Sequence, residues 1–142
     1  MSTQIRRDIL KDWVIVVIDD EPDSLEVASR ILRHYGAVVY TANNGKDGLE
    51  LIRQQRPKFV ISDLSMPVMD GWEMLFEIQQ DRYVAEIPVI ALTAHAMVGD
   101  RKRAIEAGFY NYLTKPLTPA TFMGELMRLL LDVPQFELIL SA

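Results

Sequence analysis

Acidic residues stand directly after two apolar runs of the chain. The stretch "VVIDDEP" places Asp19, Asp20 and Glu21 behind the first run, and Asp63 follows the later run "KFVIS". Because ligands of an open parallel sheet bind beyond the carboxyl ends of its strands, these carboxylates are expected to meet at one edge. Two like charges about 4 Å apart repel by about 4 kcal/mol at an effective dielectric near 20. The cluster therefore needs a positive partner.

A divalent cation and a lysine are the expected partners. Carboxylate, carbonyl and water oxygens suit Mg²⁺, and no imidazole or thiolate at these positions favours a softer metal. Thr93 and Lys115 follow two further runs, which adds a hydroxyl and an ammonium to the same edge. These groups together suit a phosphoryl group. An aspartate could also accept that group, and Asp63, alone opposite the paired acids, is the better-placed nucleophile.

The elements that must position these residues alternate along the chain. Short β-rich runs alternate with amphipathic segments, which is typical of a parallel sheet covered by helices on both faces. The first run is apolar at every position, which indicates a central strand. Asp23 and Thr118 are the expected N-caps of the first and last helices. Strands are predicted at 14–18, 37–40, 58–62, 88–92 and 110–113, and helices at 23–35, 46–54, around 72–78, 97–107 and from 118 to about 130.

Composition narrows the functional class. With 142 residues, 49% of them hydrophobic, the chain suits one compact domain. A net charge of -5 argues against general affinity for nucleic acid, and the absence of cysteine excludes disulfides and thiolate metal sites. No stretch approaches the roughly 20 apolar residues that a membrane span needs. We therefore expect a cytoplasmic protein with neither nucleic acid nor a membrane as a direct partner.

Two terminal segments lie outside the alternating pattern. Residues 1–12 are expected to form an arm or a short helix, residues 13–132 the domain, and residues 133–142 a tail. The tail "VPQFELILSA" is apolar enough to require burial. It could pack against its own domain or carry a homodimer contact.

Four motifs together resemble the receiver domain of two-component response regulators. They are "VVIDDEP", "VISDLSMPVMDGWEML", "IPVIALTAH" and "YLTKPL", in this order and spacing, and the resemblance covers roughly Trp13 to Leu131. It implies an α/β fold, a doubly wound (βα)₅ five-stranded parallel sheet of the flavodoxin-like order 2-1-3-4-5.

The resemblance also implies a role for each acidic residue. Asp63 is the phosphoacceptor in this interpretation, and Mg²⁺ is the cofactor. Asp20 and Asp63 bind the metal directly, the backbone carbonyl of Ser65 is a third ligand, and Asp19 acts mainly through a bound water.

The residues that would respond to phosphorylation lie in the last two motifs. Thr93 and Ala94 belong to the phosphate-binding switch, and Lys115 pairs with the phosphoryl group. Tyr112 matches an aromatic residue that swings inward, although simple packing would also explain it. The peptide bond between Lys115 and Pro116 is expected to be cis. Ser65 and His95 match positions that tune the lifetime of the phosphoryl group.

The sequence thus predicts a single-domain response regulator rather than an enzyme. A sensor histidine kinase or a histidine phosphotransfer protein would supply the phosphate. Because the chain ends soon after the last domain helix, a downstream protein or a homodimer would give the output. A phosphorelay intermediate, a chemotaxis-type regulator and an unphosphorylated receiver-like scaffold remain alternatives. A Mg²⁺-dependent phosphohydrolase is disfavoured, because Ser65 stands where such an enzyme would have a second acid.

Overall fold

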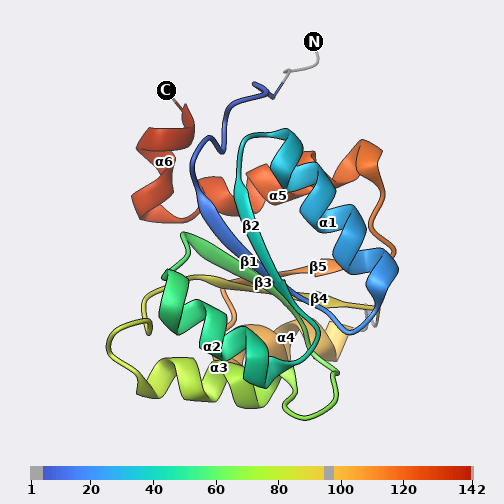
Figure 1. Ribbon diagram of the computed structural model, residues 1–142, viewed down its shortest axis with the longest axis vertical. Coiled ribbons are helices and arrows are strands. Elements are labelled where there is room, and N and C mark those ends of the chain that lie inside the picture. The colour runs from blue at the N-terminus through green and yellow to red at the C-terminus, as the bar shows by residue number, and fades with distance from the viewer. Residues whose placement is uncertain (1–4, 95–97, 142) are drawn as a thin grey trace.

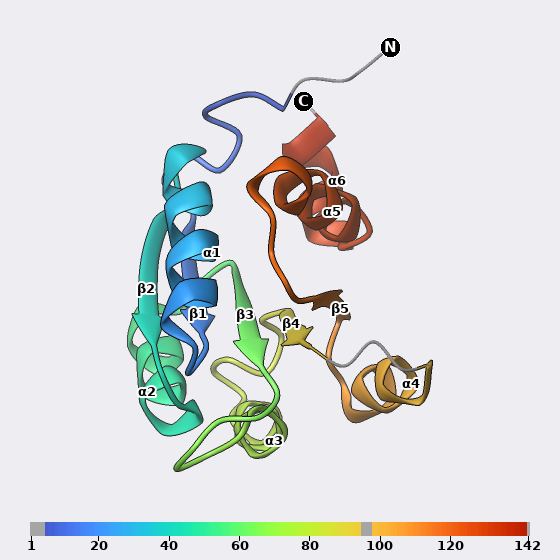
Figure 2. The same cartoon turned by 90° about the vertical axis from the view of Figure 1, so that its right-hand side faces the viewer.

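A five-stranded parallel sheet forms the centre of the protein (Figures 1 and 2). The computed structural model describes residues 5–94 and 98–141. The strand order β2-β1-β3-β4-β5 is the predicted 2-1-3-4-5. β2 lies on one side of β1, and β3, β4 and β5 follow on the other side, so the strand order reverses between β1 and β3. The strands are β1 (Val14–Ile18), β2 (Val38–Ala42), β3 (Phe59–Asp63), β4 (Val89–Thr93) and β5 (Asn111–Thr114).

Helices cover both faces of this sheet. Figure 2 shows α1 and α5 on one face and α2, α3 and α4 on the other. Along β1, Ile15 and Val17 belong to the hydrophobic core under the first layer, whereas Val16 and Ile18 belong to the core under the second. A strand buried on both faces explains the uninterrupted apolar run. The helices are α1 (Pro22–His34), α2 (Gly45–Gln55), α3 (Gly71–Gln80), α4 (Val98–Ala107), α5 (Pro119–Leu131) and α6 (Pro134–Ser141).

Segments near both ends of the described residues contribute to the hydrophobic core, and Figure 1 shows α6 beside α5. Residues 7–12 form turns rather than a regular helix, and Leu10 is fully buried. Within the tail, α6 places the ring of Phe136 4.9 Å from that of Trp13, and Leu140 is also buried. Three apolar residues of the tail, Val133, Phe136 and Leu140, are therefore buried against their own chain. No helix in the described ranges is long and apolar enough to cross a membrane.

One of the two predicted N-caps differs in the structure. The N-cap of α1 is Glu21, so Asp23 lies in the first turn, and its prediction as the cap was wrong. Pro22 explains the earlier start, because proline has a fixed φ that suits the first helical position. Glu21 makes no side-chain capping bond, since its carboxylate lies 2.6 Å from Lys115. Thr118 is the N-cap of α5 but bonds the hydroxyl of Thr121.

Candidate phosphoryl and metal site

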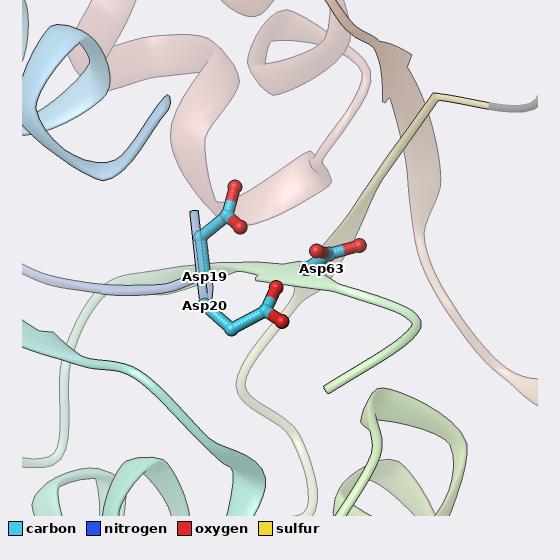
Figure 3. A group of neighbouring side chains, drawn as sticks. All are labelled: Asp19, Asp20 and Asp63. Carbon is cyan, nitrogen blue, oxygen red and sulfur yellow. The ribbon is translucent and has the colours of Figure 1, made fainter. Parts of the chain in front are cut away.

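Three aspartates meet at the carboxyl end of the sheet. Asp19 and Asp20 directly follow β1, and Asp63 is the last residue of β3, which pairs with β1 in parallel. One carboxylate oxygen from each of the three lies within 4.8 Å of the others. Figure 3 shows the three side chains gathered beyond the strand ends. The sheet topology thus creates the acidic cluster that the sequence predicts.

The three carboxylates differ in exposure and in hydrogen bonding. Asp19 is completely buried, Asp63 is buried, and Asp20 is exposed. One oxygen of Asp19 accepts a hydrogen bond from the backbone N–H of Glu21 at 2.9 Å, and Oδ1 of Asp63 accepts one from that of Leu64 at 2.7 Å. Backbone donors therefore fix the orientation of both buried carboxylates, while Asp20 is open to the solvent.

Lys115 supplies the positive charge in this cluster. Its Nζ lies 2.9 Å from Oδ2 of Asp19, 2.6 Å from Oε1 of Glu21 and 3.2 Å from Oδ2 of Asp63. Only 7% of the lysine side chain is exposed. It follows β5, and its peptide bond to Pro116 is cis, as the resemblance implies. One ammonium is thus shared among three carboxylates.

The electrostatics favour a further cation. Burial and the charge of Asp19 raise the pKa of Asp63, and Lys115 only partly offsets them. The pKa of Asp20 is also raised, by partial desolvation and by the charge of Asp63. Burial disfavours the charged form of Lys115, but its hydrogen bonds to Glu21 and Asp19 raise its pKa overall. The cluster therefore holds more negative charge than its lysine balances.

The donor set fits a hard divalent cation such as Mg²⁺. Oδ2 of Asp19 is buried and accepts no hydrogen bond from the described residues, although the Lys115 ammonium lies within ion-pair distance. The three aspartates offer only oxygen ligands, and Mg²⁺ prefers carboxylates together with water. Asp20, on the open side, leaves room for that water.

A cleft of about 470 Å³ surrounds the cluster. Asp20 and Asp63 line it, as do four other residues of the sequence prediction: Ser65, Thr93, Ala94 and Lys115. Thr93 is buried at the end of β4. Other predicted residues do not line the cleft. Asp19 is buried, Tyr112 is half-buried in β5, and His95 lies outside the described residues.

Four further residues of the cleft were missing from the sequence prediction of the site. They are Leu64, Trp72, Asp100 and Arg103, whereas the resemblance already implies a place for Asp70 in the loop beside the acceptor. Asp70 is the N-cap of α3, and its carboxylate accepts a hydrogen bond from the backbone N–H of Glu73 at 2.8 Å. Trp72 lies in α3, whereas Asp100 and Arg103 lie in α4. Nothing in their spacing indicates that α3 and α4 turn these side chains toward the same cleft.

Comparison with known proteins agrees with this geometry. The family model described as "Response regulator receiver domain" matches residues 15–126. An uncharacterized 14.6 kDa protein of Leptolyngbya boryana is 41% identical over 115 residues, which is 81% of this chain and 85% of that protein. Six other curated relatives are longer, and the chain spans only 12% to 44% of their length. Protein PilH of Pseudomonas aeruginosa is 32% identical over 109 residues, which is 77% of this chain and 90% of that protein.

Two solved structures extend the likeness to the fold. The chemotaxis response regulator CheY4 of Vibrio cholerae superposes with a TM-score of 0.78 at 27% identity, covering 84% of this chain and all of that one. The receiver domain of the sensor histidine kinase PA1611 of Pseudomonas aeruginosa has a TM-score of 0.73 at 32% identity. The match covers 82% and 96% of the two chains, and that structure has a magnesium ion coordinated in its active site cleft.

The family is a signalling domain of two-component systems rather than a classical enzyme, and its members pair with histidine kinases. The matched region contains the whole acidic cluster and the shared lysine. This chain belongs to the response regulator receiver domain family.

Proposed function

We propose that the protein is a phosphorylation-activated response regulator whose phosphoacceptor is Asp63. The observation that carries the proposal is the position of this carboxylate. Asp63 is the last residue of the central strand β3. Its carboxylate lies close enough to those of Asp19 and Asp20 to share a metal ion with them, and 3.2 Å from the ammonium of Lys115. An acceptor needs a carboxylate that a cation site and a fixed ammonium flank on either side.

The bonds that change in the transfer belong to this carboxylate and to a phosphohistidine donor. A carboxylate oxygen of Asp63 forms a bond to phosphorus while the phosphorus–nitrogen bond breaks. The bonding electron pair goes to the imidazole nitrogen of the donor, and the proton already carried by the other ring nitrogen leaves the donor as neutral histidine. Lys115 and the hydroxyl of Thr93 then bind the transferred oxygens. Catalysis of this kind consists mainly of positioning and charge stabilisation.

Mg²⁺ is the cofactor of this proposal. Asp20, Asp63 and the backbone carbonyl of Ser65 would hold it, with Asp19 acting mainly through a bound water. When bound, the ion offsets negative charge on the phosphoryl oxygens. The oxygen-only donor set and the buried Oδ2 of Asp19 support this assignment.

Saturation with Mg²⁺ is expected to stabilise the protein. At ten times its dissociation constant the ion adds about 1.4 kcal/mol to the free energy of unfolding. For a chain of this size the melting temperature should rise by about 3–6 °C. Thermal melts with and without Mg²⁺ measure the shift, and Asp20→Asn should remove most of it. An equal shift in that variant would contradict the metal assignment.

The proposed partners follow from the same chemistry. A sensor histidine kinase or a histidine phosphotransfer protein supplies the phosphate in the cytoplasm, and a downstream protein or a second copy of the chain receives the signal. The added phosphoryl group draws Thr93 and Lys115 toward a state that the protein already samples. Ala94 lies beside Thr93, and Tyr112 turns inward with it in this proposal. Neither nucleic acid nor a membrane is a direct partner.

Incubation with acetyl phosphate and Mg²⁺ tests this function. The intact mass of the wild-type protein should increase by one phosphoryl group, and EDTA should prevent the increase. If the mass stays unchanged and no beryllofluoride complex forms in the presence of Mg²⁺, the receiver-like scaffold becomes the better interpretation.

A further inference from the structure

Arg103 places a second cation at the phosphoryl cleft. It lies in α4 and lines the same cleft of about 470 Å³ as Asp63 and Lys115. Its side chain is 69% exposed, whereas that of Lys115 is 7% exposed. One cation is therefore buried at the base of the cleft, and the other faces the solvent from which a phosphate donor arrives.

A contact from α3 orients the guanidinium of Arg103. Its central carbon lies 5.1 Å from the ring centre of Trp72 in α3, a cation–π distance. The ring of Phe109 packs edge-on against Trp72 at 5.4 Å between centres and 84° between planes, which fixes the indole. Stacking on a ring face leaves the N–H groups at the edge of the guanidinium free to donate.

The remaining contact of Arg103 is weak. Its Nη1 lies 3.8 Å from Oδ1 of Asp100, one turn earlier in α4, which is beyond hydrogen-bond distance. Among the residues that the structure describes, Asp100 is its sole ionic partner. Lys115, by contrast, is within 3.2 Å of three carboxylates. At the same cleft, Lys115 is therefore held by close ion pairs, whereas Arg103 has N–H groups that can still bind an anion.

An anionic donor must enter a cleft that is predominantly acidic. The cleft is lined by two cations and five acids, which are Asp20, Glu21, Asp63, Asp70 and Asp100. We propose that Arg103 binds the anionic oxygens of the incoming phosphodonor and thereby sets the affinity for it. Arg103 is thus a positioning residue that acts before the chemical step. This inference rests on the proposed phosphoacceptor function and adds a donor-binding residue to it.

Arg103→Gln is therefore expected to weaken donor binding without slowing the chemical step. With acetyl phosphate and saturating Mg²⁺, the donor concentration that gives the half-maximal initial rate should rise about two- to five-fold, the range for an exposed ion pair. The maximal rate should stay within about twofold of the wild type. Arg103→Lys should recover part of the affinity, because it restores the charge but not the planar fork. High salt should shrink the difference.

Arg101→Gln is the matched control. Arg101 lies two residues earlier in α4, where its guanidinium is 5.6 Å from the ring centre of Tyr112, and it does not line the cleft. It carries the same charge in the same helix, so a general field effect would weaken donor binding equally in both variants. The inference expects wild-type affinity for this control.

Each outcome has a defined meaning. Wild-type donor affinity in Arg103→Gln, or a loss confined to the maximal rate, would overturn the inference. An equal loss of affinity in Arg101→Gln would also overturn it, because the position of Arg103 would then not be the cause. An equal loss in Arg103→Lys would do the same, because the positive charge would then not be the cause. Failure of the wild-type protein to gain a phosphoryl group would instead reject the proposed function on which the inference rests.

Discussion

Asp63→Asn should gain no phosphoryl group from acetyl phosphate and Mg²⁺ under conditions that phosphorylate the wild-type protein. An amide has no anionic oxygen to attack phosphorus, whereas its size matches the carboxylate. The variant should remain folded, because burial and Asp19 raise the pKa of Asp63 and the charged form is already disfavoured there. Intact mass measures the phosphoryl gain, and a thermal melt reports the fold.

Asp70→Asn is the matched control for this substitution. Asp70 also lines the cleft, but its carboxylate caps α3 through the backbone N–H of Glu73. Asparagine is as good an N-cap as aspartate, so this variant should lose a charge in the cleft without losing the fold. It is expected to gain one phosphoryl group. A phosphoryl gain in Asp63→Asn at the wild-type rate would mean that another residue is the acceptor.

Lys115→Met should destabilise the metal-free protein. Methionine keeps a long apolar side chain but leaves Asp19 and Asp63 facing each other without a counter-charge. Breaking a buried ion pair costs about 3–5 kcal/mol, and the opening of the cleft to solvent reduces this to roughly 2–3 kcal/mol. The melting temperature should fall by roughly 4–12 °C at neutral pH. Mg²⁺ should restore part of the loss, because it supplies positive charge to the same carboxylates.

The pH dependence of this effect has a definite sign. The folded pKa of Lys115 is raised, so its stabilisation is fully present at neutral pH and is lost only as alkaline pH rises through that pKa. Asp63 has a raised pKa in the fold, so a fall in pH protonates it first there and relieves the repulsion in the variant. The deficit of Lys115→Met should therefore shrink as the pH falls below neutral.

A lysine on the surface provides the comparison. Lys46 is exposed in the first turn of α2, away from the cleft. Lys46→Met should change the free energy of unfolding by no more than about 0.5 kcal/mol. If Lys115→Met and Lys46→Met had the same melting temperature in the absence of Mg²⁺, the ion pairs of Lys115 would not stabilise the fold as proposed.

The acidic cluster could be predicted because its position follows from topology. Carboxylates directly after central apolar runs must meet at one sheet edge once the strands are parallel and adjacent. The pairing of Ile18 with Ser62 in β1 and β3 places Asp19 beside Asp63 in this way. The lysine and the threonine follow by the same rule from β5 and β4.

Exact strand starts and the packing of separate segments could not be predicted. Strands β2 to β5 each begin one residue later than their apolar runs, because hydrophobicity does not mark where the hydrogen bonds between strands start. The sequence also left open whether the tail would pack internally, since that depends on Trp13 offering a surface for Phe136. The approach of Arg103 to Trp72 required the relative placement of two helices.

The location of the phosphoryl group on the chain tests the central claim most directly. Wild-type protein treated with acetyl phosphate and Mg²⁺ can be reduced with borohydride, which converts an aspartyl phosphate into homoserine. Peptide mass spectrometry then identifies the reduced position. Our account predicts homoserine at position 63 and none at positions 19 and 20. Homoserine at either of those positions, or a stable phosphoryl group on a residue other than aspartate, would contradict it.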